Sequence, residues 1–412
     1  MAHSDSGSSQ RATGVSGKAF SLAAACLAAF APASSWALFS DSVEIWAAEN
    51  YTHDTNVLRL SKNINPAAVG APTVHGDDIY TTHLGLTANV PVSLQQFTAE
   101  LDWFRSRYKY FTDFDFTGHT ARANWNWVVN PTFNGTLGAS EAQGLASFAN
   151  IQNREPDIIK TREAYATGNW MVTPRYRANA GVNYGETKHD DPLRQVNDIQ
   201  LASGELGYSY VTPLDNSFGV VTRYEQGRLP HGTNLNNVPF DNAYKQWGVG
   251  AMTTWFATPK SRFDGRIDYV RRNYDQAPQR DYRGPMWKAL YTWAPTPKLT
   301  VAAALVRDVG PSQDINTSFV LINGGYVRPR WNITEKITLQ ANAEYNVWDY
   351  RQDILTGQSV THHVRTFGVS IAYRPAPKVL LSAGINREVR TSTLVTGDYE
   401  VTVGFIEGRV GF

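Results

Sequence analysis

A short turn rich in proline recurs along the chain at intervals of 38 to 46 residues. An interval of about forty residues accommodates two β-strands, one long loop and one tight turn. Proline suits such turns because it fixes φ and does not need to donate a hydrogen bond to a strand ladder. The repeat therefore predicts a chain built from successive β-hairpins. Its turns are centred on Pro91, Pro131, Pro174, Pro213, Pro259, Pro297, Glu335 and Pro377.

An aromatic residue stands four positions before most of these turns. Six of the eight turns have it, as Trp127, Trp170, Trp255, Trp293, Trp331 and Tyr373. Trp and Tyr concentrate at the two interfaces of a membrane. A ring at a constant distance from each turn is typical of the aromatic girdle of a transmembrane barrel. A soluble sandwich or propeller with Trp in its core is the alternative.

Between the turns, apolar and polar residues alternate. In the segment 337–347, Ile337, Leu339 and Tyr345 fall on one face, and Gln340 and Glu344 fall on the other. A period of two indicates β-strands. The segments are long enough to cross a bilayer, for which about 9–11 residues suffice. Short turns also alternate strictly with longer polar loops, which favours a membrane barrel over a soluble sandwich.

These features predict an all-β fold, a transmembrane antiparallel up-and-down β-barrel of eighteen strands, or sixteen if the two least regular strands are discounted. Short turns would face the periplasm and long loops the cell exterior, with both termini on the periplasmic side. A barrel of this size can enclose an aqueous channel. The longest loop, 52–77, is a candidate to fold inward. The last strand ends at Phe412 and resembles the signal read by the barrel assembly machinery, which would be a partner.

The N-terminus has the pattern of a targeting segment. A basic stretch precedes an apolar run at 19–31, and Ser35 and Ala37 are the small residues of a cleavage site. A lipoprotein signal using Cys26 is the weaker alternative. The sequence thus predicts a signal peptide at 1–37 and one barrel domain at 38–412, located in the outer membrane of a Gram-negative bacterium and in contact with its lipid.

Composition and motifs exclude several other classes of protein. There are 38 basic and 37 acidic residues, and this balance argues against a nucleic-acid partner. One cysteine excludes a disulfide scaffold. Nucleophile elbows, zinc-protease helices and phosphate-binding loops are absent. His362-His363, His189-Asp190-Asp191 and His75 with Asp77 and Asp78 lack a suitably spaced third ligand. We therefore expect no enzyme, catalytic residue, cofactor or metal.

Strand parity assigns many charged side chains to the inner face of the barrel. A solvated wall with charges paired between strands is one interpretation, and an arginine-lined path for an anionic or highly hydroxylated polymer is the other. The first holds for most of these residues. Arg175 with Arg177 and Arg328 with Arg330 are the best candidates for the second. Tyr165, Tyr326 and Trp348, if they share the inner face, could stack on sugar rings, although core or girdle aromatics would look the same. The pore-lining candidates are Arg122, Arg175, Arg177, Arg223, Arg266, Arg272, Arg328, Arg330, Glu344, Arg390 and Arg409.

The first strand region carries the most specific pattern in the chain, with Asn50, Asp54, Asn56, Leu58 and Arg59. Together with the Pro-x-Pro-Lys turns and the Gly-Phe ending, it resembles the EpsL-type outer-membrane proteins of exopolysaccharide biosynthesis, within the broader β-barrel porin group. The resemblance covers essentially the whole chain after the signal peptide. It implies an outer-membrane pore that exports a polysaccharide substrate together with periplasmic polysaccharide-export proteins, and it supplies no catalytic residues.

Three functions follow in order of preference. The first is export of an exopolysaccharide through the barrel. The second is a general or substrate-selective diffusion porin for uptake of small solutes. The third is an outer-membrane enzyme whose site is assembled from several strands.

Overall fold

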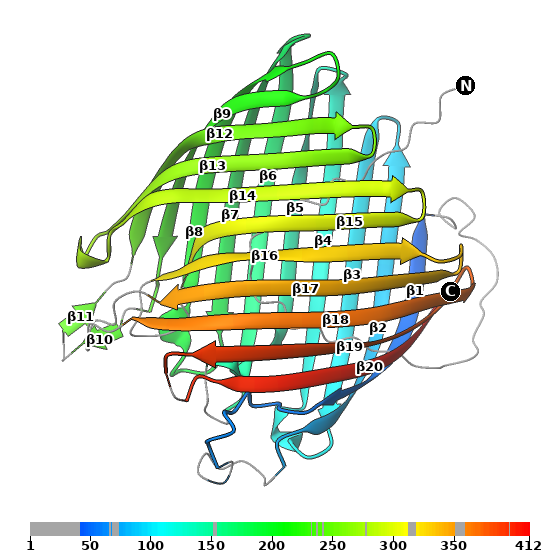
Figure 1. The fold of residues 1–412 in the computed structure, drawn as a ribbon, viewed down its shortest axis with the longest axis vertical. Coiled ribbons are helices and arrows are strands. Elements are labelled where there is room, and N and C mark those ends of the chain that lie inside the picture. The colour runs from blue at the N-terminus through cyan, green and yellow to red at the C-terminus, as the bar shows by residue number, and fades with distance from the viewer. Residues whose placement is uncertain are drawn as a thin grey trace.

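The computed structural model describes residues 42–412 except 66, 68–73, 151–154, 232, 236–237, 241–242, 277, 312–318, 351–358 and 395. The predicted signal peptide at 1–37 lies outside the described residues. Long antiparallel strands wrap around a single closed barrel, with short turns at one end and longer loops at the other (Figure 1). No helix in the described part of the chain is long and apolar enough to cross a membrane.

Eighteen strands form the barrel, so the predicted count is confirmed and the fallback of sixteen is wrong. Each strand pairs with its neighbour in sequence, and β1 pairs with both β2 and β20, which closes the sheet. The strands are β1 (Val43–Asp54), β2 (Asp77–Val92), β3 (Gln95–Tyr108), β4 (Phe116–Asn130), β5 (Phe133–Leu145), β6 (Ile158–Thr173), β7 (Tyr176–His189), β8 (Ile199–Val211), β9 (Ser217–Arg228), β12 (Tyr244–Thr258), β13 (Ser261–Tyr274), β14 (Tyr282–Thr296), β15 (Leu299–Pro311), β16 (Phe319–Asn332), β17 (Ile337–Tyr350), β18 (Val360–Ala376), β19 (Val379–Ser392) and β20 (Tyr399–Gly411).

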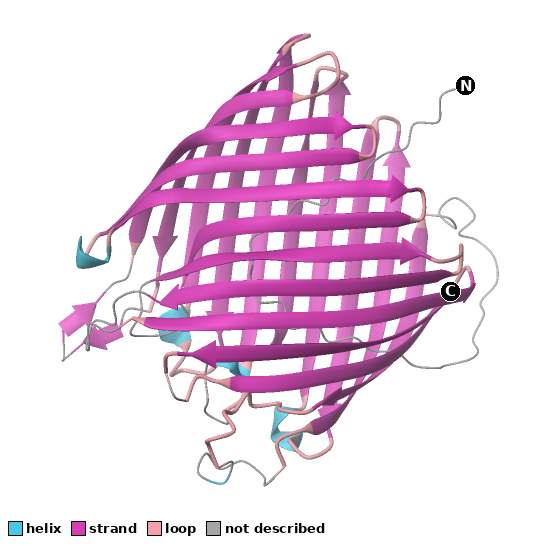
Figure 2. Cartoon of the chain, viewed as in Figure 1, coloured by secondary structure: helices cyan, strands magenta, loops and turns pink. Residues whose placement is uncertain are grey.

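The long-loop end carries small elements that the periodicity did not predict. Between β9 and β12, the strands β10 (Thr233–Leu235) and β11 (Val238–Phe240) form a separate hairpin. Single turns of 3-10 helix stand in other loops, and Figure 2 shows them in cyan. They are η2 (Thr112–Phe114), η3 (Phe148–Asn150), η4 (Gln195–Asn197) and η5 (Pro278–Arg280).

The predicted girdle residues lie on the outer face near the short turns. Trp170, Trp255, Trp293, Trp331 and Tyr373 are 42–53% exposed, as expected for side chains that meet lipid. Above them the outward face is aliphatic and equally exposed, with residues such as Leu206, Val249 and Ile406. The barrel thus presents an apolar belt to its surroundings, and its buried side chains lie on the inner face and under the loops.

Two apolar clusters fill part of the barrel at the long-loop end. One contains Tyr244, Tyr274, Met286, Phe319 and Leu321 on strands β12 to β16. The other contains Val57, Leu58 and Leu60 of the first loop, packed on Phe111, Phe114 and Phe148 of the next two loops. The first loop therefore lies across this end of the barrel beside β3, instead of extending away from it. Its residues 66 and 68–73 are outside the described residues.

The apolar belt yields a stability prediction. Val249 is 63% exposed on the outer face and lies six residues along β12 from the girdle residue Trp255, near the middle of the belt. Val249→Arg should lower the free energy of unfolding by about 2–4 kcal/mol, because a cation would face hydrocarbon. Guanidinium titration of the barrel in phospholipid bilayers, followed by Trp fluorescence, measures this. Ser203→Arg on the inner face of β8 is the control, and an equal loss there would contradict the assigned faces.

Candidate functional site: the barrel lumen

Contacts that cross intervening strands identify the inner face. Arg266 of β13 reaches Glu205 of β8, with a Nη1–Oε2 distance of 2.6 Å, although β9 and β12 stand between these strands. Only side chains on the concave side of a curved sheet can converge in this way. The ladder register then assigns the inward face of every strand, and it is the face opposite the exposed apolar belt.

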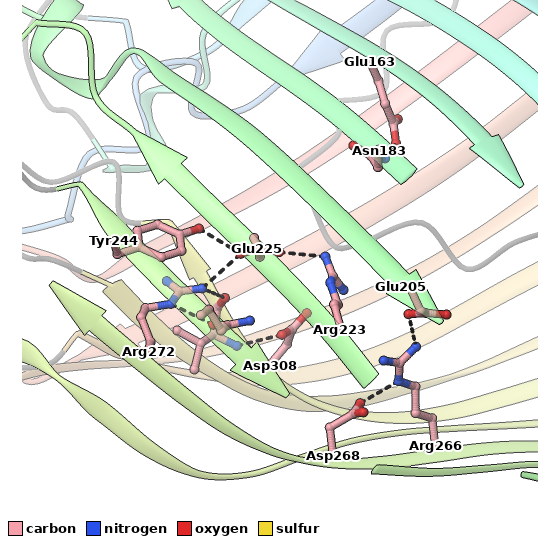
Figure 3. Close-up of polar contacts among 12 residues, drawn as sticks. Glu163, Asn183, Glu205, Arg223, Glu225, Tyr244, Arg266, Asp268, Arg272 and Asp308 are labelled. Atoms are coloured by element: carbon pink, nitrogen blue, oxygen red, sulfur yellow. Dashed lines mark hydrogen bonds and ion pairs between the residues drawn. The ribbon is translucent and has the colours of Figure 1, made fainter. Parts of the chain in front are cut away.

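A buried charge network occupies the inner wall near the first apolar cluster (Figure 3). Arg272 is 1% exposed and donates through Nε to Gln246 Oε1 at 2.8 Å and through Nη2 to the Val309 carbonyl at 3.2 Å. Its Nη2 lies 3.5 Å from Glu225 Oε1. Arg223 and Tyr244 bind the same carboxylate at 2.7 and 2.9 Å. The Tyr244 ring also faces the Arg272 guanidinium at 3.9 Å.

A second group of charges runs down β13 toward the short turns. Arg266 binds Asp268 on its own strand as well as Glu205, with its Nε 2.6 Å from Asp268 Oδ2. Closer to the turn, Arg262 pairs with Asp264 at 2.8 Å. Between residues 262 and 268 the inward face of β13 therefore alternates positive and negative side chains, and Figure 3 shows Arg266 and Asp268 of this series.

Other inward arginines are paired individually. Arg328 binds Glu344 at 2.9 Å and covers the Tyr326 ring at 3.9 Å. Arg409 lies 3.3 Å from Glu44 and 4.1 Å from the centre of the Trp46 ring. Arg390 is buried and donates to the Gly397 carbonyl.

Four candidates form no ion pair with a carboxylate among the described residues. Arg122 faces Glu100 in the ladder without an ion pair, and Arg330 faces Gln340. Arg177 donates to the Ser217 hydroxyl at 3.4 Å. Arg175 differs, because it lies in the turn before β7 and donates to the Tyr210 hydroxyl at 3.1 Å.

The first loop forms a compact, hydrogen-bonded turn at the long-loop end of the barrel, which we call the Asn56 turn. The Asn56 side chain donates to the Leu60 and Glu400 carbonyls and accepts from the Leu60 amide. Arg59 has a left-handed φ of 54°, and its Nη1 lies 2.8 Å from Asp54 Oδ2. Burial acts to lower the pKa of the Arg59 guanidinium, but the Asp54 carboxylate more than offsets this, so the pKa is raised and Arg59 stays charged.

The histidine-containing loops form ordinary hydrogen bonds and ion pairs. His189 and His231 both contact Asp198, at 3.0 and 3.1 Å. His53 pairs with Asp78 at 2.8 Å. In the part of the chain that the structure describes, no group of three His, Cys, Asp or Glu side chains is placed to hold a metal ion.

Comparison with known proteins adds a family match. Residues 246–412 match the family described as Putative beta-barrel porin 2. No curated protein matches the chain. Among solved structures, it is similar to Pseudomonas aeruginosa OpdK with vanillate, at 8% identity and a TM-score of 0.47, over 91% of this chain and 100% of that one. It is also similar to OccK2 (OpdF) of the same organism, at 10% identity and a TM-score of 0.49, over 91% of this chain and 99% of that one.

The chain is an outer-membrane β-barrel whose residues 246–412 match a porin family. Its closed sheet, its apolar outer belt and the family match place it in the outer membrane of a Gram-negative bacterium.

Sequence reasoning missed several inward groups of the barrel. Arg262 has the same parity as Arg266 and could have been included. Glu44 and the His83–Asp102 pair, with 2.7 Å between ring nitrogen and carboxylate, are also inward. The pattern at Asp54, Asn56 and Arg59 marked the Asn56 turn as a specific feature of the sequence, but it did not predict the geometry of that turn.

The buried charge network yields a prediction about the porin's stability. Arg272→Met removes a guanidinium that is 1% exposed and leaves Gln246 and the Val309 carbonyl without their donor. We expect a loss of about 3 kcal/mol in the free energy of unfolding. Arg328→Met is the control, since its side chain is 51% exposed, and it should cost less than about 1 kcal/mol. Equal losses in guanidinium titrations would contradict the assignment of Arg272 as a buried structural charge.

Proposed function

We propose that the barrel is a diffusion channel for small hydrophilic solutes, with a preference for anions. The observation that carries this proposal is a charged inner wall that water can reach. The inward side chains of Arg223, Arg262 and Arg328 keep 43–51% of their surface exposed although each is ion-paired. A wall of this kind can replace part of a solute's hydration shell with charged and hydrogen-bonding groups as the solute passes.

The preference for anions rests on the arginines without carboxylate partners. Arg177 and Arg330 lie near the short turns, and Arg122 lies further along the wall on β4. These three guanidinium groups form no ion pair with a carboxylate among the described residues, so they remain available to a passing anion, although Arg122 faces Glu100 across the ladder. The guanidinium fork also matches carboxylate and phosphate groups. Small organic anions are therefore the solute class that the wall accommodates best.

Ion selectivity tests this proposal. The triple variant Arg122→Gln, Arg177→Gln and Arg330→Gln should lower the chloride-to-potassium permeability ratio by about two- to threefold, because the unpaired positive charges are lost. The reversal potential of the porin in planar bilayers under a KCl gradient measures this ratio. The matched control replaces Arg105, Arg107 and Arg365, three arginines on the outer face. A barrel that passes no ions, or equal shifts in both triple variants, would overturn the proposal.

Export of an exopolysaccharide is the second candidate, favoured by specific inward residues. Tyr326 lies on the inner face with Arg328 over its ring, and the inward Tyr165 donates to Asn124 Oδ1 at 2.6 Å. Aromatic rings beside hydrogen-bonding groups suit sugar rings. The resemblance at Asp54, Asn56 and Arg59 points to the same function, and it brings periplasmic polysaccharide-export proteins as partners. Recognition of Phe412 by the barrel assembly machinery belongs to either function.

Deletion of the gene separates the two candidates. An export channel predicts that polymer no longer reaches the medium while uptake of small solutes is unchanged. A diffusion channel predicts that secretion of polymer is unchanged while uptake of small solutes falls. It also predicts that small sugars and small carboxylates permeate in liposome-swelling assays. Normal secretion in the deletion strain would eliminate export.

A further inference from the structure

Arginine and lysine side chains are frequent on the outer face near the long-loop end. Several of them have carboxylate partners on the same face. Lys160 and Arg162 of β6 bind Glu141, with distances of 3.0 and 2.6 Å, and Arg387 of β19 binds Glu400 at 2.7 Å. Such pairs satisfy the cations within the protein.

Other outer-face arginines, such as Arg105, Arg107 and Arg365, have no ion pair among the described residues. One sector sets two unpaired arginines directly opposite each other, and we call its three residues the arginine patch: Arg271 on β13, Arg283 on β14 and Arg307 on β15. Arg271 and Arg283 stand directly opposite each other in the ladder, and both are exposed. Among the described residues, neither has a carboxylate within ion-pair distance. Arg271 Nε donates to Asn273 Oδ1 at 3.0 Å. The nearby Asp281 accepts instead from the Asn273 side chain and the Tyr274 amide.

Arg307 is held at the edge of the same patch by a break in the sheet. The β14–β15 ladder ends at the pair Trp287–Arg307. Pro285, two residues further along β14, has no N–H to continue a ladder. Arg307 Nε donates to the Pro285 carbonyl at 3.2 Å, and its guanidinium covers the Trp287 ring at 5.2 Å. Its Nη1 also donates to Asn323 Oδ1 on β16 at 2.7 Å, so the Arg307 guanidinium is held in place over Trp287 at the edge of the patch.

The patch lies where the apolar belt ends. Arg271 is eight residues along β13 from Phe263, and Arg283 is ten residues along β14 from the girdle residue Trp293. Since about 9–11 residues of a tilted strand cross the bilayer, both guanidinium groups reach the headgroup level of the outer leaflet. Trp247, which pairs with Arg271, and Tyr269 lie on the outer face beside the patch and are about 60% exposed.

We propose that the arginine patch binds a phosphate group of the phosphorylated glycolipid that forms the outer leaflet. Like charges placed directly opposite each other in a sheet are destabilising. A phosphate between Arg271 and Arg283 offsets that repulsion and accepts hydrogen bonds from both guanidinium groups. The exposed rings beside and below the patch then contact the lipid's acyl chains. This inference does not depend on what passes through the lumen.

The β6 sector supplies a matched control. Lys160 and Arg162 are ten and eight residues from the girdle residue Trp170, so they lie at the same depth as Arg283 and Arg271. Unlike Arg271 and Arg283, both form ion pairs with Glu141, and Arg162 also lies 3.6 Å from Glu186. Removing these two cations changes the net charge equally but removes no unpaired site.

The experiment measures glycolipid binding to the detergent-solubilised, folded barrel. Bisphosphorylated lipid A is the probe, and its dephosphorylated form and phosphatidylglycerol are the comparisons, with bound molecules counted by native mass spectrometry. We expect the double variant Arg271→Gln, Arg283→Gln to bind bisphosphorylated lipid A more weakly by a factor of about ten or more. The Lys160→Gln, Arg162→Gln variant should bind as the unaltered protein does. Arg283→Gln alone, which keeps the rest of the patch, should give an intermediate loss.

Three outcomes would overturn the proposal. One is undiminished binding by the double variant with a folded barrel, verified by its heat-modifiable migration in gels. Another is equal binding of the dephosphorylated glycolipid or of phosphatidylglycerol, which would indicate general lipid adhesion. The third is an equal loss in the β6 control variant, which would indicate a net-charge effect.

Discussion

Backbone N–H and C=O groups have no water to bind within the hydrocarbon of a membrane, so each must be paired inside the protein. In this chain the requirement is met by a sheet with no free edge, since β1 pairs with both β2 and β20. Closure determines the rest of the design. It gives every strand one face toward lipid and one toward the lumen. Apolar outward residues and polar or charged inward residues therefore alternate along each strand. The low content of charged residues, 18%, follows from reserving half of each strand for lipid.

Closure also determines how the inward charges are stabilised. Side chains on a concave surface converge, so carboxylates can serve arginines from strands that are not adjacent, as Glu205 serves Arg266 and Glu225 serves Arg272. Near the long-loop end these charges abut an apolar cluster and become buried, and there they are multiply hydrogen-bonded. Toward the short turns they stay in contact with water. The lumen therefore combines a rigid, partly filled region with an open, charged one, and the open region suits solutes.

The sequence allowed the architecture to be predicted, because its determinants are local. Turn prolines such as Pro259, girdle residues such as Trp255 and the parity of the strands each depend on a few neighbouring residues. The inner face of residues such as Arg266 follows from the same parity. The pairing of Arg266 with Glu205 could not be predicted, because it depends on the ladder register and the curvature over four strands. The hairpin of β10 and β11 and the Asn56 turn could not be predicted either, because they depend on tertiary contacts that leave no periodic pattern in the sequence.

The contrast between the inner and outer faces of the barrel is informative about the arginines without carboxylate partners. Inside the barrel, water can solvate Arg122 and Arg330, so their lack of a carboxylate costs little and leaves a field for solutes. On the outer face at the edge of the belt, water is scarcer and the hydrocarbon of the membrane begins beside these side chains. Arg271 and Arg283 oppose each other there, whereas Lys160 and Arg162 at the same depth have Glu141. An anion from outside the chain is the group that balances the first pair, and the lipid headgroup is the nearest source of one.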